Sequence, residues 1–328
     1  MVNYSGSQAF VLAAQETTFN TTVSTTKDLG IIGELSPDLN NNIIPVNQIG
    51  SREAAALVAG NFDGALSIDG TLSSGAPFEM FFGQATDAET TGNYKHTFID
   101  TSSTELVLSL LKSYSISENY DSVSDIGVLY GGCSMNSLDL SITLNEVVSI
   151  SGELLAANAT NSASIGTKVL NTTTPLSFSQ CYLSTGVLSS EVAQNLVSDF
   201  SISLANNIDY NDIRGIGSRI AQGALPKMLE ITGDFTMKFA NTTEANRFLG
   251  GSSAVTTGTP APTSIIFNAH NGVTLGSGRI ELYIRLVDCQ YESLGRTISS
   301  DGIVEESYSY RATSISDAYF VDQVATYF

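Results

Sequence analysis

The sequence predicts a mainly β protein made of two similar β-sandwich or barrel domains that arose by internal duplication, each with one short helix. Three observations lead to this prediction. Apolar and polar residues alternate along many segments, the same motifs occur twice in the same order, and few segments have helical periodicity. A chain of 328 residues is long enough for two domains of about 150 residues, each able to bury a core.

The internal repeat is the strongest of these observations. The tetrapeptide Ile-Gly-Ser-Arg at residues 49–52 recurs 167 residues later, at 216–219. An Asn-Asn-Ile segment precedes each copy, and an alternating segment followed by an apolar-Gly pair comes after it. Because the order is the same in both copies, we infer a duplication, with domains at residues 1–158 and 176–328 and a polar linker at 159–175.

The strands follow from period-two alternation. The segments 61–72 and 228–239 alternate strictly between apolar and polar residues, and residues 138–150 continue the pattern in the first half. One face of each predicted strand is apolar and points toward a core. The other face carries Ser, Thr and four carboxylates, namely Asp63, Asp69, Glu230 and Asp234.

Two segments are helix candidates. Residues 242–248 follow the second alternating segment, and the sequence predicts a short helix there with Thr243 as its N-cap. Residues 103–111 fit a helix or a buried strand about equally, because their apolar run has no clear period.

Composition excludes some classes of function. Charged residues are only 14% of the chain and the net charge is −19, so the surface is built from Ser, Thr and Asn. This acidic balance excludes a protein that grips nucleic acid through its phosphates, but not one past which nucleic acid slides. The first seven residues carry no basic stretch, and no apolar run could span a membrane, so we expect a protein made and assembled inside a cell.

Catalytic and metal-binding patterns are nearly absent. His96 and His270 are the only histidines, and neither follows a G-x-S-x-G motif. Cys133, Cys181 and Cys289 have no metal-ligand spacing and are predicted to be small buried hydrophobes. The four carboxylates could act in glycoside hydrolysis, but regular strands rich in Ser and Thr favour a solvated sheet face. We expect no enzyme, no metal site and no cofactor.

The motif order resembles the tail tube proteins of tailed phages and archaeal viruses, in a duplicated form. The shared pattern is Leu-x-Asn-Asn-Ile, Ile-Gly-Ser-Arg, an alternating strand with Gly, and Asn-Ser-Leu-x-Leu-x-Ile. The likeness covers residues 33–83, 132–152, 199–237 and 301–312. It implies β-domains that join edge to edge into a ring whose inner sheet lines a channel, and a long loop that reaches the adjacent ring.

The resemblance also implies a function and partners. The chain would be the major tail tube subunit, a structural virion protein that polymerises into stacked rings for genome delivery after assembly in the host cytoplasm. Because single-domain tube proteins make sixfold rings, a duplicated chain predicts trimeric rings with pseudo-sixfold symmetry; a hexamer with one half outward is the competing arrangement. Expected partners are other copies of the chain, the tape measure, terminator, and baseplate or tip proteins, and DNA only in non-specific transit. The alternative class is another virion or surface β-protein, such as a capsid decoration, spike or adhesin.

Two sets of site residues follow from this interpretation. The polar strand faces give the channel-lining candidates Asp63, Asp69, Glu230 and Asp234, with outer surface as the alternative. Loops at residues 36–57 and 206–227 are predicted to carry ring stacking, although Arg52 and Arg219 would also serve to tie each loop to its own domain. The stacking candidates are Asn41, Asn42, Ile43, Ile49, Arg52, Asn206, Asn207, Ile208, Ile216 and Arg219.

Overall fold

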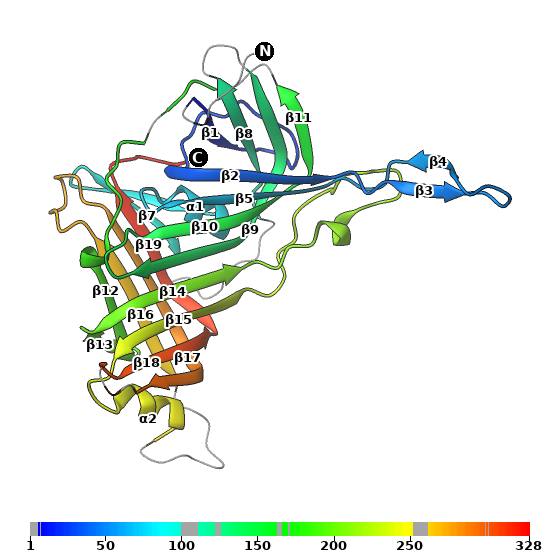
Figure 1. The fold of residues 1–328 in the computed structure, drawn as a ribbon. Coiled ribbons are helices and arrows are strands. Elements are labelled where there is room, and N and C mark those ends of the chain that lie inside the picture. The colour runs from blue at the N-terminus through cyan, green and yellow to red at the C-terminus, as the bar shows by residue number, and fades with distance from the viewer. Residues whose placement is uncertain are drawn as a thin grey trace.

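The chain folds as a mainly β protein, as the alternation predicted. The structure is a computed structural model, and it describes residues 6, 8–99, 111–121, 126–162, 166–169, 171–251, 262–298, 300 and 302–328. Figure 1 shows a body of β-sheets from which one hairpin, β3–β4, projects far to the side. The body contains the core, and the hairpin lies outside it.

The described elements are almost all strands. In the first half they are β1 (Phe10–Gln15), β2 (Ile31–Asn40), β3 (Ile44–Asn47), β4 (Ala54–Val58), β5 (Asp63–Thr71), β6 (Thr86–Thr90), β7 (Asn93–Ile99), β8 (Tyr114–Asp121), β9 (Ile126–Thr143), β10 (Ser149–Ala156) and β11 (Asn158–Ser162). In the second half they are β12 (Cys181–Val187), β13 (Ser190–Gln194), β14 (Val197–Ala205), β15 (Glu230–Lys238), β16 (Thr263–His270), β17 (Glu281–Thr297), β18 (Glu305–Ala312) and β19 (Ser314–Asp322). The described helices are α1 (Ala76–Phe82) and α2 (Thr243–Leu249), with 3-10 turns η1 (Phe178–Gln180) and η2 (Tyr210–Ile213).

Eight of the described strands form one antiparallel layer, which we call the long sheet. Its order is β2-β5-β10-β9-β14-β15-β18-β17. The first four strands come from the first half of the chain and the last four from the second half. The two sets meet at the β9–β14 pair, in the middle of the sheet, and β2 and β17 are its edges (Figure 1).

Strands β9 and β17 each extend beyond the long sheet and take part in a second sheet. The first part of β9 pairs with β8 and β11, and β1 completes this N-terminal sheet. The first part of β17 pairs with β16 and β19, and the C-terminal sheet extends from them to β12 and β13 on one side and to β7 and β6 on the other. Gly132 in β9 and Asp288 in β17 have positive φ of 61° and 50° where each strand passes from one sheet to the next.

The predicted apolar faces form the core. Leu66 and Ile68 of β5 are buried, as are Ile231 and Phe235 of β15, while the residues between them are more exposed. This confirms the alternation on which the strand prediction rested. Cys133 and Cys289 are also buried, as expected, and burial raises the pKa of both thiols, whereas Cys181 is partly exposed.

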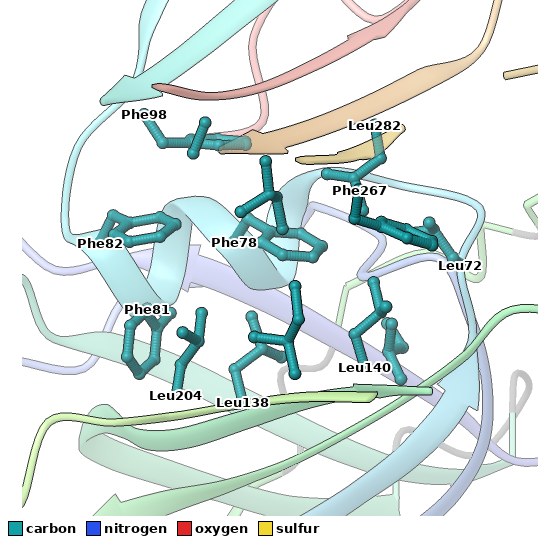
Figure 2. Close-up of a cluster of buried hydrophobic side chains, with 14 of the residues drawn as sticks. Leu72, Phe78, Phe81, Phe82, Phe98, Leu138, Leu140, Leu204, Phe267 and Leu282 are labelled. Atoms are coloured by element: carbon teal, nitrogen blue, oxygen red, sulfur yellow. The ribbon is translucent and has the colours of Figure 1, made fainter. Parts of the chain in front are cut away.

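Helix α1 fills the space between the long sheet and the C-terminal sheet. All seven of its residues are buried. In Figure 2, Phe78 and Phe82 lie toward Phe98 of β7, and Phe81 points toward Leu204 of the long sheet. Full burial of each such side chain is worth about 1.5–3 kcal/mol, so α1 is a main source of cohesion between the two layers.

One helix prediction needs a correction, and one helix was not predicted. Helix α2 lies where a helix was expected, but its N-cap is Thr242 rather than Thr243. The described helix of the first half is α1, which was not predicted from the sequence, and the candidate at residues 103–111 lies outside the described residues except for Leu111. Helix α1 is buried on every face because two layers cover it, and Glu79 is its only polar residue, so it has no 3.6-residue apolar period to detect.

Corresponding elements recur at a constant spacing in the two halves. Helices α1 and α2 begin 167 residues apart, and each ends at a left-handed glycine, Gly83 and Gly250, with φ of 71° and 74°. Strands β5 and β15 also begin 167 residues apart. The region between the halves differs from the prediction, because residues 159–162 of the expected linker belong to β11.

A buried histidine joins the two halves. His96 of β7 is fully buried; its Nδ1 lies 2.7 Å from Asp87 Oδ1 and its Nε2 lies 3.1 Å from Asp322 Oδ1 of β19. The Tyr327 ring packs 4.2 Å from the imidazole, and its hydroxyl donates to Asp322 at 2.6 Å. Both ring nitrogens face carboxylates, which the doubly protonated imidazolium satisfies best.

We expect this clamp to make stability depend on pH. Burial lowers the pKa of His96, but the hydrogen bonds that its ring donates to Asp322 and Asp87 outweigh this effect and raise the pKa above 6.5. The imidazolium therefore stabilises the fold fully below about pH 6.5, and this contribution is lost as pH rises through the folded pKa. Urea unfolding from pH 5.5 to 9 should show stability falling, and His96→Gln should cost about 3 kcal/mol at pH 6 and flatten the profile. His270→Asn, at the partly exposed end of β16, is the control; a profile unchanged in His96→Gln would contradict the clamp.

Candidate assembly surfaces

The outward face of the long sheet is polar and acidic. Because side chains alternate, one face of each strand packs on the core and the other is left uncovered. Two rows across neighbouring strands illustrate the uncovered face: Asp69, Ser151, Asp139, Ser203 and Thr232 in one, and Ser149, Ser141, Ser201, Asp234, Ser309 and Ser293 in the other. Small hydroxyls with scattered carboxylates make this face hydrated and negative.

The four predicted lining carboxylates fall into two pairs with different surroundings. Asp69 and Asp234 are exposed, and neither side chain has a partner among the described residues. Asp63 instead accepts from Arg214 at 2.5 Å and from the Asn42 amide. Glu230 accepts from Arg311 at 2.5 Å, and Arg311 also donates to Glu292 at 2.7 Å.

These carboxylates do not form a catalytic pair. Strands β5 and β15 are four places apart in the long sheet, which corresponds to roughly 19 Å. Along one strand, Asp63 and Asp69 are about 20 Å apart and Glu230 and Asp234 about 13 Å apart. Glycoside hydrolysis needs two carboxyl groups within about 9.5 Å, so none of these combinations fits that chemistry.

The first predicted stacking loop is a β-hairpin. We expected residues 36–57 to lack strand structure, but β2 runs to Asn40 and β3 pairs with β4, with Ile44 opposite Val58. Every residue of β3 and β4 is exposed, and Ile49 at the tip is 102% exposed. Residues 43–58 thus form an arm with apolar side chains and no core of its own, which we call the hairpin arm (Figure 1).

The second loop folds back onto the body. Asn206 and Ile208 are buried, and the Tyr210 hydroxyl donates to the carbonyls of Gly132 at 2.6 Å and Leu155 at 2.8 Å. Ile216, at the tip of this loop, is 112% exposed. Asn206 and Ile208 hold the loop in place and are not available as a contact with another ring.

The two predicted arginines differ in role. Arg219 donates through Nε to the Gly60 carbonyl at 2.7 Å and through its guanidinium to Asn41 Oδ1 at 2.9 Å, so it ties the second loop to the base of the hairpin arm. The sequence had predicted such a tether as the alternative to ring stacking, but within each domain. Here Arg219 instead connects the second loop to the base of the first. Arg52, near the arm's tip, is exposed and has no hydrogen-bond or ion-pair partner among the described residues.

The loop bases have matching backbone conformations. Asn42 and Asn207 both have positive φ, at 45° and 52°. Their side-chain amides donate to carbonyls in corresponding places, those of Asn61 at 3.2 Å and Met228 at 3.0 Å. The repeated Asn-Asn-Ile motif therefore specifies a turn in which Asn tolerates the left-handed region and bonds to the next strand.

An apolar groove lies at the opposite end of the long sheet from the hairpin arm. It occupies about 330 Å³ between the end of β9 and the start of β14. Leu144, Phe178 and Tyr182 line it and are partly exposed. The subunit thus has an apolar projection at one end and an apolar recess at the other.

The described residues hold no group of three or more His, Cys, Asp or Glu side chains placed to bind a metal ion. No helix among them is long and apolar enough to cross a membrane. Sequence reasoning missed Arg214, whose guanidinium reaches Asp63 across 151 residues of chain. Only the fold brings these two residues together.

The fold and these surfaces define a mainly β protein with a polar sheet face, a projecting hairpin arm and an apolar groove. A family model described as phage tail tube protein matches residues 6–312. The chain belongs to the phage tail tube protein family, a family of structural, non-enzymatic components of the virion tail, which confirms the resemblance seen in the sequence. No curated protein matches the chain.

Proposed function

We propose that this chain is the major subunit of a viral tail tube, a duplicated form that polymerises into stacked rings with the long sheet facing the channel. One observation carries the proposal: a continuous sheet with two open edges and an acidic, small-polar outward face, in a member of the tail tube family. Open edges are unstable alone, and ring closure pairs them.

The chemistry of the outward face suits a channel for DNA. A wall bearing Asp69 and Asp234 repels phosphates, so DNA in transit is not held. The partners follow from this role: further copies of the chain, the tape measure, terminator, and baseplate or tip proteins, and DNA in non-specific passage. Assembly would take place in the host cytoplasm.

We expect three chains per ring. Three copies of the eight described strands give a wall of 24 strands, which at about 4.8 Å per strand and a tilt of about 40° closes at roughly 45–50 Å between backbones. Such a channel admits a double helix once side chains are included. Native mass spectrometry of rings released from tubes should give trimers; six chains per ring would contradict this and favour the arrangement with one half outward.

Stacking is assigned to the two ends of the subunit. The hairpin arm and the Ile216 tip project from one end, and the groove at Leu144 lies at the other, so head-to-tail contacts repeat without limit along the tube. Ile43, Ile49, Arg52 and Ile216 remain contact candidates. Asn41, Asn42, Asn207 and Arg219 shape the loop bases, and Asn206 and Ile208 act inside the subunit.

Negative-stain microscopy of the purified protein tests this function. Tubes or stacked rings are expected above a critical concentration. Single particles at every concentration would contradict the tube and favour the alternative class, a capsid decoration, spike or adhesin.

A further inference from the structure

The pairing of β9 with β14, which we call the internal joint of the long sheet, is a template for how its two open edges could pair. Strands β9 and β14 pair where the two halves meet, with Leu138 opposite Leu204 and Leu140 opposite Ile202. All four side chains are buried. The outer strands β2 and β17 end the sheet with no further strand beside them among the described residues.

Edge strand β2 has the construction of β14. Each pairs with the next strand of its own half, β5 or β15, and each has a bulge at the same place, between Ile32 and Glu34 in β2 and between Val197 and Asp199 in β14. Leu39 of β2 corresponds to Leu204, because both stand one place before the end of the strand. Leu39 is 42% exposed, whereas Leu204 is buried in the joint.

Edge strand β17 has the construction of β9. Each pairs with the strand that follows it, and each has one extra residue at the same place, Asn136 in β9 and Glu292 in β17. Leu294 of β17 therefore corresponds to Leu138. Ile298, just after β17, corresponds to the buried Ile142 but is 74% exposed.

A side-chain clamp closes the internal joint. The Asn206 amide, just after β14, donates to the carbonyls of Phe81 in α1 and Met135 in β9, both at 3.0 Å. Asn41 stands in the same place after β2 but is exposed, and Arg219 holds its Oδ1 at 2.9 Å. Arg219 therefore fixes the orientation of the Asn41 side chain, while the Asn41 amide nitrogen has no acceptor among the described residues.

We propose that two copies of this chain join through β17 and β2 in the register of the internal β9–β14 joint. Leu39 of one copy then lies opposite Leu294 of the next, and Leu35 opposite Ile298. The Asn41 amide donates to the carbonyls of Phe248 and Tyr291, which correspond to those of Phe81 and Met135. This assignment rests on the proposed tube and specifies the contact that closes its rings.

The seam between copies differs from the internal joint in two respects. Pro37 and Arg296 stand where Ile202 and Leu140 meet in the internal joint, and Pro37 has no backbone N–H to donate across the seam, so one ladder hydrogen bond of the internal joint is missing there. Arg296 is paired within its own chain, donating through Nε to Glu306 at 2.8 Å. The seam therefore has less apolar contact than the internal joint, which suits subunits that fold first and associate afterwards.

A paired cysteine experiment tests the register. In a Cys181→Ser background, which removes the partly exposed native thiol, Leu39→Cys with Leu294→Cys places two thiols directly opposite across the seam. Oxidation of assembled tubes should give intermolecular disulfides, with covalent species up to the full ring on non-reducing gels. The control is Leu39→Cys with Gly295→Cys, because residue 295 faces the other side of the sheet and should give at least tenfold less cross-link.

A second variant tests the clamp without new thiols. Asn41→Asp keeps an oxygen acceptor for Arg219 and removes the two donated hydrogen bonds, so it should raise the critical concentration for assembly at least tenfold with unfolding unchanged. Arg52→Ala at the exposed tip is a control for ring closure measured on short rings.

Tubes that give no 39–294 cross-link, or as much 39–295 cross-link, would overturn the register, and an unchanged critical concentration for Asn41→Asp would overturn the clamp. Failure of the unsubstituted protein to assemble would instead contradict the tube itself.

Discussion

Replacing residues 44–58 by a two-residue Asn-Gly turn is expected to abolish tube growth and leave the subunit folded. Ile44 lies opposite Val58, so a tight turn can join residues 43 and 59. The removed residues of β3 and β4 are all exposed and contribute nothing to the core, so the free energy of unfolding should change by less than about 1 kcal/mol. Electron microscopy should show rings or protomers without tubes.

Matched point variants separate the arm from its receiving surface. Ile49→Asp places a charge at the arm's tip, and Leu144→Asp places one in the groove at the other end of the sheet. Both should block stacking, and neither should prevent ring formation. If the shortened protein grows tubes of normal length and spacing, ring stacking is carried elsewhere.

Lysines on the outward face are expected to convert a passive channel into one that binds DNA. Asp69→Lys with Asp234→Lys changes two exposed carboxylates that have no partner among the described residues, so folding and ring formation should persist. Asp63 is a poor choice for this test, because its replacement would also break the ion pair with Arg214. Each phosphate contact makes the log of the affinity fall more steeply with the log of the salt concentration, by about 0.9 in slope. Six lysines per trimeric ring should therefore retain DNA strongly at 50 mM salt and weakly at 200 mM.

The measurement is DNA ejection from particles and binding of a short duplex to open tubes at both salt concentrations. Glu89→Lys with Thr86→Lys, both exposed on β6, adds a similar charge away from the long sheet. Those tubes should bind DNA at their outside without slowing ejection. Normal ejection by the Asp69→Lys, Asp234→Lys variant at low salt would show that these residues do not line the channel.

Several strands of the long sheet could be predicted from sequence because they have one buried and one open face. Alternation at 61–72 and 228–239 located β5 and β15, and the repeated motifs located the turns after β2 and β14. These signals are local, since side-chain direction in a strand depends only on position. Helix α1 could not be found this way, because burial on all sides removes its period.

The contacts between the two halves could not be predicted from the sequence. The pairing of β7 with β19, the His96 clamp and the Arg214–Asp63 ion pair all join residues far apart in the chain. The hairpin arm was expected as an irregular loop because its β3 and β4 strands are exposed on both faces and show no alternation. The sequence also offered no reason to distinguish between the four carboxylates. Only their neighbours in the fold show which of them have a side-chain partner and which do not.

A cryo-EM reconstruction of the assembled tube would show directly whether the long sheet lines the channel. We expect a continuous lining of 24 strands built by three chains per ring, with the face carrying Asp69 and Asp234 toward the channel. Two kinds of joint should alternate around it, β9–β14 within a chain and β17–β2 between chains. A lining formed by the C-terminal sheet, or a ring of six chains with one half of each outside the wall, would contradict it.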